Sequence, residues 1–269
     1  MSAARVGIVG VAGRMGAELV KAVGTEGRAQ LAAAVDRPGS PSIGKDSGTQ
    51  VGRHANGVPV SADLKAVLSG VDVVIDFSRA DAVGATADAC AAAGVALMIG
   101  TTGLDAATQQ RIDAAARRIP VLVSANTSLA LNVLLELVRR AAQALPDTYD
   151  IEIFEAHHRH KVDAPSGTAL VLGDAAAKGR GQTLQRPVSL TGSGHGERAP
   201  AGIGFSVARG GDVVGEHDVR FLGAGEQLKL SHVATDRAIF ARGALAAALW
   251  LIGRPANRYQ MADFLFENQ

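Results

Sequence analysis

The densest group of chemically active side chains lies in the segment Glu155–Thr168, which reads EAHHRHKVDAPSGT. His157, His158 and His160 account for three of the seven histidines in the chain, and Lys161 follows them directly. Histidine can hold a proton near neutral pH and deliver it, while the lysine supplies a fixed positive charge beside it. This combination indicates a catalytic centre for an anionic substrate.

The same segment continues into a predicted anion-binding turn. Ser166, Gly167 and Thr168 follow a proline and open a helix predicted over Ala169–Lys178. A helix N-terminus with a hydroxyl group and a bare glycine backbone is well suited to binding a carboxylate. We therefore expect a substrate that carries one or two carboxylates and a reducible C=N or C=C bond.

Other interpretations of this segment exist. A zinc site could use the histidines, but adjacent His157 and His158 would point to opposite sides of a strand, and no cysteine or carboxylate has a familiar ligand spacing. We therefore predict no metal. A nucleic-acid patch would need more basic residues and interleaved aromatic side chains. A solvated basic turn is the purely structural alternative.

A second candidate site lies near the N-terminus, in the run VGIVGVAGRMG. Gly10, Gly13 and Gly16 fall between a predicted strand and a predicted helix, where small residues let backbone N–H groups approach a diphosphate. The usual dinucleotide fingerprint is GxGxxG; here the middle glycine comes one place late and Ala12 holds its position. A glycine turn that only packs the helix on the strand is the alternative.

An acid and a base follow at the distance expected for nucleotide binding. Asp36 ends the second predicted strand about 20 residues beyond the glycines, where a carboxylate would bind the ribose hydroxyls of NAD. Arg37 comes next and could pair with the additional phosphate of NADP. The two together predict tolerance of either cofactor. The loops Gly100–Gly103 and Ser124–Thr127 follow later strands and offer amides and small polar groups to the nicotinamide end, or serve as plain helix caps.

The elements that would position these residues alternate regularly in the first half of the chain. Strands are predicted at Arg5–Val9, Gln30–Asp36, Val71–Phe77, Val95–Ile99 and Val121–Val123, with helices at Arg14–Val23, Ala80–Ala93 and Leu104–Arg118. Short apolar strands separated by helices indicate a parallel sheet buried on both faces. The handedness of the crossovers then favours an α/β fold with a doubly wound, Rossmann-type sheet.

The pattern changes after Asn126. A long helix is predicted at Leu129–Leu145, capped by Ser128, and the chain then alternates between apolar and polar residues as in a mixed or antiparallel sheet with one covered face. The alternating pairs are Ile151 and Ile153, Val188 and Leu190, Phe205 and Val207, Val219 and Phe221, and Leu228 and Leu230. Glycine-rich turns or loops are predicted at Gly192–Gly196, Gly210–Gly211 and Gly223–Gly225.

A final alanine-rich helix, predicted at Asp236–Leu251, resembles the N-terminal half in composition, so we place it back on the first domain. The prediction is a dinucleotide-binding domain of residues 1–127 and 237–269, and an α+β domain of residues 128–236 for substrate binding and oligomerisation. The uncovered face of the second sheet could be covered by self-association.

Composition narrows the class of protein. The chain of 269 residues has 27 basic and 26 acidic residues, and a net charge of +1 provides no general attraction to nucleic acid or anionic membrane. The lone Cys90 lies in an alanine-rich helix and is expected to pack in a core, which disfavours a thiolate-dependent reductase such as an aspartate-semialdehyde dehydrogenase. A single cysteine and the lack of a secretory pattern predict a cytoplasmic protein. A nucleotide-sensing regulator would need the glycine turn but no His/Lys pair.

The run EAHHRHKVDAPSGTA closely resembles the signature of the 4-hydroxy-tetrahydrodipicolinate reductases, formerly dihydrodipicolinate reductases, of the diaminopimelate–lysine pathway. The stretches GVAGRMG, IDFSR, GTTG, SAN and ALWL resemble the same family in the same order. The resemblance therefore covers nearly the whole chain. It implies reduction of a cyclic dicarboxylate by NADH or NADPH with loss of water, in a homotetramer assembled through the sheet of the second domain.

The resemblance also implies roles for individual residues. His157 would be the proton donor and Lys161 its cationic partner, with His158, Ser166, Gly167 and Thr168 binding the substrate. The cofactor would be lined by Gly10, Val11, Ala12, Gly13, Arg14, Met15, Asp36, Arg37, Gly100, Thr101, Thr102, Ser124, Ala125, Asn126 and Thr127. Two positions depart from the common family pattern: Thr127 stands where an aromatic or bulky residue is frequent, and Asp36 where many relatives carry Glu. Both bear on cofactor preference rather than on the reaction.

Overall fold

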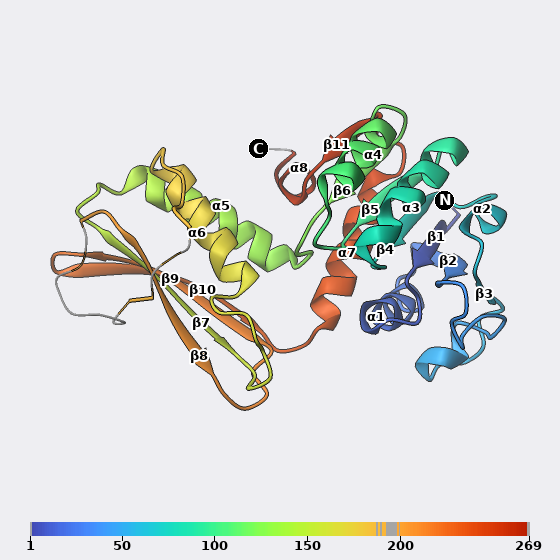
Figure 1. Cartoon of the computed structure of the whole chain (residues 1–269), viewed down its shortest axis with the longest axis horizontal. Helices are drawn as coiled ribbons and strands as arrows, with labels where there is room; N and C mark the ends of the chain where they lie inside the picture. Colours follow the sequence, from blue (N-terminus) through green and yellow to red (C-terminus); the bar gives the residue numbers. More distant parts are fainter. Residues whose placement is uncertain (1, 187, 189, 192–197, 199, 268–269) are drawn as a thin grey trace. The chain divides into compact units, whose positions relative to one another are not determined.

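The computed structural model describes residues 2–186, 188, 190–191, 198 and 200–267. Clustering of the chain's internal contacts gives two compact units. Unit 1 comprises Met1–Leu129 and Ala238–Gln269, and unit 2 comprises Ala130–Arg237. The helices and strands of both units are labelled in Figure 1.

Unit 1 is built on a seven-stranded sheet in which every pairing is parallel, with the order β11-β6-β5-β4-β1-β2-β3. Its strands are β1 (Ala4–Val9), β2 (Ala29–Val35), β3 (Val60–Ser61), β4 (Val73–Asp76), β5 (Ala96–Ile99), β6 (Pro120–Val123) and β11 (Asn257–Tyr259). Its helices are α1 (Arg14–Val23), α2 (Leu64–Val67), α3 (Ala80–Ala93), α4 (Ala106–Ala116), α7 (Ala238–Leu251) and α8 (Met261–Phe266), with a 3₁₀ turn at Thr49–Val51.

Both faces of this sheet are covered by helices. Because successive residues of each strand point to opposite sides, a single strand contributes side chains to two cores. On β4, Val73 and Ile75 belong to the core that includes α1 and α7, whereas Val74 belongs to the core that includes α3 and α4. All three side chains are fully buried. The continuous apolar runs seen in the sequence therefore have the expected cause, and the predicted doubly wound parallel sheet is confirmed.

Helix α7 completes the first of these two cores although it lies more than 100 residues beyond the last of the sheet's central strands. Ala244, Ala247 and Ala248 are fully buried in the same cluster as Leu19 of α1. Small residues allow a close approach: a Cβ on Gly243 would lie only 1.8 Å from the carbonyl oxygen of Thr127. The alanine-rich composition of this helix thus fits the narrow space that it fills.

Unit 2 is a four-stranded mixed sheet with the order β10-β9-β7-β8. Strand β7 pairs parallel with β8 and antiparallel with β9, and β9 pairs antiparallel with β10. Its strands are β7 (Asp150–His157), β8 (Ile203–Arg209), β9 (Gly215–Gly223) and β10 (Glu226–Ala234), and its helices are α5 (Leu129–Ala144), which begins at the boundary, and α6 (Gly167–Gly179). The predicted α+β architecture is confirmed.

Helices α5 and α6 cover one face of this sheet (Figure 1). Ile151 and Ile153 of β7 point into the core formed with them, together with Phe205, Val219 and Phe221. The alternation in the sequence reflects this single covered face. Because Glu155 and His157 follow Ile153 at steps of two, the same alternation places both of them on the covered face at the end of β7.

Several expectations need correction. Val188 is not assigned to a strand, and Leu190 forms an isolated parallel bridge to Phe205 of β8; residues 187, 189 and 192–197 beside them lie outside the described residues. The short edge strands β3 and β11 were not expected, because two or three residues are too few to show a periodic pattern. The predicted loop Gly192–Gly196 lies outside the described residues. Among the described residues, no helix has the length and apolar character to cross a membrane.

Candidate active site

His157 is the last residue of β7 and is 8% exposed. Its Nδ1 atom lies 2.6 Å from Oε2 of Glu155, two residues earlier on the same face of the strand. The structure thus places the predicted proton donor on a rigid strand end, with one ring nitrogen engaged by a buried carboxylate. The other nitrogen, Nε2, is left for chemistry.

Glu155 is held by groups from two other elements. Arg209, at the end of β8, donates to both carboxylate oxygens at 2.7 Å, and the backbone N–H of Ser166 donates to Oε1 at 2.9 Å. Burial raises the pKa of Glu155, but the hydrogen bonds from Arg209, His157 and Ser166 outweigh burial, so the net pKa is lowered. The carboxylate is therefore ionised at neutral pH.

Ser166 joins this cluster to helix α6. Its Oγ caps the helix by accepting from the N–H of Ala169 at 3.1 Å, and it lies 3.1 Å from Nε2 of His217 on β9. The rings of His157 and His217 meet edge to face, with centroids 5.1 Å apart. Burial, followed by repulsion from His157, lowers the pKa of His217 to about 4.

This lowered pKa predicts a pH-dependent stability. Because the folded chain resists protonation of His217 while the unfolded chain protonates near pH 6.5, stability is intact above pH 6.5 and declines as the pH falls toward 4. We expect His217→Asn to remove roughly 2 kcal/mol of the stability lost between pH 7 and pH 4.5. Urea unfolding at both pH values measures this, with exposed His54→Asn as the control. Equal losses in wild type and His217→Asn would contradict the assignment.

Lys161 lies in the loop between β7 and α6, four residues beyond His157. Its Nζ pairs with Oδ1 of Asp163 at 2.7 Å, and its side chain is 21% exposed. Arg209 connects this loop to the buried cluster, because it donates to the backbone oxygen of Asp163 at 2.7 Å. The predicted acid and the predicted cation are thus linked through one arginine.

The remaining predicted substrate residues lie around the same loop. His158 is partly buried, and its backbone N–H donates to the carbonyl of Val213 at 2.7 Å. Burial, followed by the charges of Arg237 and the neighbouring residues, lowers the pKa of His158, so its neutral form is favoured. Gly167 is exposed in the first turn of α6, and a Cβ there would meet nothing within 4 Å. The side-chain position of Gly167 is therefore unobstructed, and its backbone hydrogen-bonds the carboxylate of Asp163, an anion in this turn.

The glycine turn of unit 1 borders a cleft of about 950 Å³. Part of its lining is formed by Gly10, Ala12, Gly13, Asp36 and Arg37. Gly10 has a φ of +83°, and a Cβ on it would lie 2.6 Å from the carbonyl oxygen of Phe77. Gly13 caps α1, so the first N–H groups of that helix, including those of Arg14 and Met15, have no acceptor within the helix. The turn, with Val11 between its glycines, fits the diphosphate of a dinucleotide.

Asp36 and Arg37 line the same cleft directly after β2. Oδ2 of Asp36 accepts from the hydroxyl of Ser40 at 2.6 Å, which fixes the carboxylate, whereas Arg37 is exposed. Asp63, between β3 and α2, and Lys65, in α2, are among the residues that complete this end of the cleft. Sequence reasoning missed them because β3 carries no periodic signal.

The loop after β5 is held in place by a hydrogen bond to Asp76, the last residue of the neighbouring strand β4. The hydroxyl of the buried Thr101 donates to Oδ1 of Asp76 at 3.0 Å, and a Cβ on Gly100 would overlap the ring of Phe77. Thr102 is exposed. The loop therefore has a fixed base and a free tip, which suits a group that contacts a ligand.

The four residues of the loop after β6, Ser124–Thr127, differ in how deeply they are buried. Ser124 and Asn126 are partly buried and Ala125 is exposed, whereas Thr127 is 1% exposed. The hydroxyl of Thr127 donates to the carbonyl of Phe240 at 2.7 Å. Its side chain thus connects two distant segments of unit 1, and the candidates for ligand contact in this loop are the three residues before it.

Two rival chemistries find no support in the geometry. Among the described residues, no three His, Cys, Asp or Glu side chains gather as metal ligands. Cys90 is fully buried in the core of α3, and burial raises the pKa of its thiol, which opposes formation of a nucleophilic thiolate. Cys90 packs in a core, as the sequence predicts.

Comparison with known proteins identifies the family. Residues 4–127 match the family described as dihydrodipicolinate reductase, N-terminus, and residues 130–265 match its C-terminus. The chain belongs to the dihydrodipicolinate reductase family. Its relatives include 4-hydroxy-tetrahydrodipicolinate reductases from Thiobacillus denitrificans, 50% identical over 97% of this chain and 98% of the relative, and from Cereibacter sphaeroides strain KD131, 51% identical over 96% of each.

Solved structures share the fold. A dipicolinate-bound dihydrodipicolinate reductase from Paenisporosarcina sp. TG-14 superposes with a TM-score of 0.80 at 24% identity, covering 98% of this chain and all of that one. An amine dehydrogenase from Mycobacterium smegmatis gives a TM-score of 0.62 at 15% identity, covering 97% and 95%. The two-unit architecture of the dihydrodipicolinate reductase family thus extends to more distant oxidoreductases.

Sequence reasoning missed the support around the reductase's His157. Arg209 and His217 come from strands 50 or more residues away, and no local pattern indicates which residue they approach. Glu155 carried a signal, since a residue two places before His157 on a strand shares its face.

Proposed function

We propose that this chain catalyses the reduction of 4-hydroxy-tetrahydrodipicolinate to tetrahydrodipicolinate with loss of water, using NADH or NADPH, in the diaminopimelate route to lysine in the cytoplasm. The carrying observation is the arrangement of His157 on its strand end, with Lys161 and the open N-terminus of α6 in the loop that follows. The names of the relatives support the reaction, and the dipicolinate bound by the Paenisporosarcina protein supports a cyclic dicarboxylate substrate.

The residues divide the work by charge. Lys161 binds one carboxylate of the substrate, and the N–H groups of Gly167 and Thr168 bind the other, because a helix N-terminus favours an anion. The buried hydroxyl of Ser166 caps the helix and supports this turn. His158, which is held neutral, donates a hydrogen bond without adding charge. As the 4-hydroxyl group of the substrate leaves as water, a dinucleotide held in the unit 1 cleft would supply a hydride to the conjugated ring. His157 then gives its proton to the electron-rich enamine carbon of the reduced ring.

The direct test supplies the substrate as it forms. Pyruvate and aspartate semialdehyde are mixed with the preceding synthase, this protein and either NADH or NADPH, and cofactor oxidation is followed at 340 nm, the absorbance of the reduced nicotinamide. We expect oxidation that depends on all components. No oxidation of either cofactor would refute the proposed reaction.

Cofactor preference should depend on Arg37. Removing this guanidinium by Arg37→Ala is expected to raise the KM for NADPH about tenfold, since a charge-assisted bond to the additional phosphate at an exposed site is lost. The KM for NADH should change less than about threefold. Initial rates with each cofactor measure the effect, with exposed Arg53→Ala as the matched control. An equal change in both KM values would contradict a phosphate contact.

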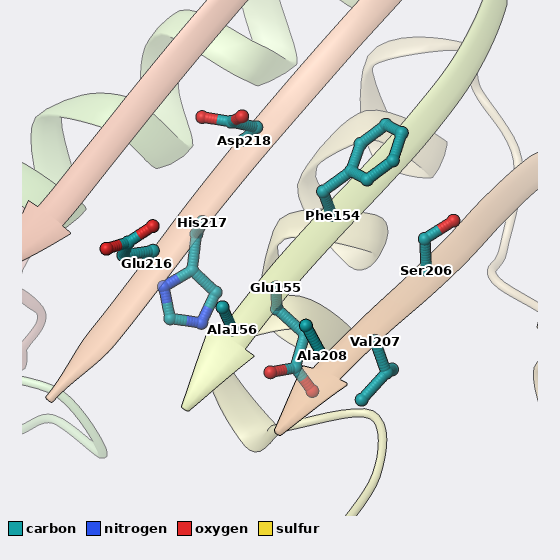
Figure 2. A pocket seen from close by; sticks show the side chains of 9 residues that line it. All are labelled: Phe154, Glu155, Ala156, Ser206, Val207, Ala208, Glu216, His217 and Asp218. Carbon is teal, nitrogen blue, oxygen red and sulfur yellow. The ribbon is translucent and has the colours of Figure 1, made fainter. Parts of the chain in front are cut away.

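We also propose that the chain forms a homotetramer through the face of the unit 2 sheet opposite α5 and α6. This face presents Phe154 and Ala156 of β7 beside Ala208 of β8, and they border a hollow of about 240 Å³ (Figure 2). On the adjacent edge, Val233 of β10 is 58% exposed. Contact with other copies would cover these apolar groups. The mass in solution, measured by light scattering, tests the proposal.

A further inference from the structure

The carboxylate of Glu155 has contacts that determine where the neighbouring proton lies. Its Oε1 accepts from the N–H of Ser166 and from Nη2 of Arg209, and its Oε2 accepts from Nη1 of Arg209. The fourth contact, at 2.6 Å, joins Oε2 to Nδ1 of His157. An ionised carboxylate can only accept hydrogen bonds, so Nδ1 must carry a proton.

A proton fixed on Nδ1 decides which nitrogen does the chemistry. The neutral ring then has its lone pair on Nε2, and the charged ring releases the proton that Nε2 holds. The space beside Nε2 is kept open by a glycine, because a Cβ on Gly215, the first residue of β9, would lie 3.1 Å from this atom. A glycine there leaves room beside the nitrogen that must exchange its proton.

Arg209 maintains the arrangement and extends it. It keeps Glu155 ionised through two parallel hydrogen bonds, a geometry that a guanidinium provides and an ammonium does not. The same guanidinium donates to the backbone oxygen of Asp163, whose carboxylate pairs with Lys161. Arg209 therefore orients the Glu155 carboxylate that contacts His157 and also fixes the loop that carries Lys161.

We propose that Glu155 and Arg209 are positioning residues: they hold His157 in the Nδ1–H form, aim Nε2 at the substrate and tie this acid to the Lys161 loop. This inference rests on the proposed function for its kinetic consequence. The position of the proton on His157, however, follows from the structure alone and can be measured without turnover.

The decisive variant is Glu155→Gln, because an amide presents one oxygen and one NH₂ group. Whichever way it turns, the NH₂ group faces donors, either Ser166 N–H and Arg209 or Arg209 and His157. Of these donors only His157 can become an acceptor, by moving its proton from Nδ1 to Nε2, so the amide is expected to place its NH₂ group beside His157, where one of its two conflicts is removed. We expect kcat to fall about 10- to 100-fold with the KM for substrate within about threefold. The pH profile of kcat should change as well, because the charged ring loses the carboxylate that accepts from its Nδ1–H.

Glu152→Gln is the matched control. Glu152 lies on the same strand, is 4% exposed and is paired with Arg198 at 2.7 Å, but it has no contact with His157 and points to the other face. A general loss of a buried ion pair would affect both variants alike. We expect Glu152→Gln to leave the pH profile in place even where it lowers thermal stability.

Histidine-selective ¹⁵N labelling reads the proton directly, with the His157 signals assigned by their loss in His157→Gln. The wild-type chain is expected to show Nδ1 protonated and Nε2 free in the neutral form, and Glu155→Gln the reverse. A wild-type ring protonated on Nε2, or a Glu155→Gln enzyme with the rate and pH profile of Glu152→Gln, would overturn the inference. If the wild-type protein oxidises no cofactor, the proposed reaction is refuted, but the wild-type spectrum still shows which nitrogen of His157 carries the proton. The same spectrum tests the inference if the Glu155→Gln variant does not fold.

Discussion

Replacing His157 with Gln is expected to lower kcat about 10²- to 10⁴-fold, the range usual for removal of a general acid. Glutamine keeps a donor for the Glu155 carboxylate and a similar shape, so the strand end should keep its structure. What it lacks is a proton that it can release near neutral pH. The KM for substrate should change little, since the carboxylates bind elsewhere.

Single-turnover measurements with substrate generated in situ separate chemistry from binding for this variant. His160→Gln is the natural control, because His160 lies three residues further along the same segment and is exposed. A His157→Gln enzyme that retains nearly the wild-type rate, while binding substrate normally, would remove His157 from the mechanism.

Replacing Lys161 with Ala is expected to lower kcat/KM about 100-fold or more. The lysine would supply the charge-assisted hydrogen bond to a substrate carboxylate, and its loss would leave that carboxylate without its cation. The effect should fall on KM as well as on kcat, which distinguishes it from the His157 change. Lys161→Arg keeps the charge and should recover part of the loss.

Steady-state kinetics over a wide range of substrate concentrations measure both parameters. Lys178→Ala, an exposed lysine in the last turn of α6, controls for a general loss of positive charge. Should Lys161→Ala and Lys178→Ala behave alike, Lys161 would have no contact with the substrate.

The sequence was sufficient for features that arise from local periodicity. The parallel sheet followed from apolar runs such as Val71–Phe77, which contains β4, and α3 was predicted at the bounds that it has in the structure, Ala80–Ala93. The helix after Pro165 was predicted over Ala169–Lys178 and begins two residues earlier, at Gly167, with Ser166 as its cap. These features need only neighbours in the chain, so a single sequence carries their signal.

Features that depend on contacts between distant residues could not be predicted from the sequence. The alternating pair Val188 and Leu190 appears in the described residues only as a bridge from Leu190 to Phe205, because alternation shows that a segment could pair but not how far its partner extends. The Arg209–Glu155 contact joins residues 54 positions apart, and nothing near either residue indicates the other. Thr127 looked like a ligand contact from its loop position, yet its hydroxyl is engaged by Phe240, a partner 113 residues away.

The return of α7 to unit 1 affects the order in which the two units fold during synthesis. The core shared by α1, β1 and β4 is closed by α7, so until residue 251 has left the ribosome the apolar surface of Leu19 and Ile75 lacks its cover. Unit 2 is continuous in sequence and complete by residue 237, so it has all of its own core before unit 1 does. The N-terminal unit, although synthesised first, is therefore the later of the two to become fully folded.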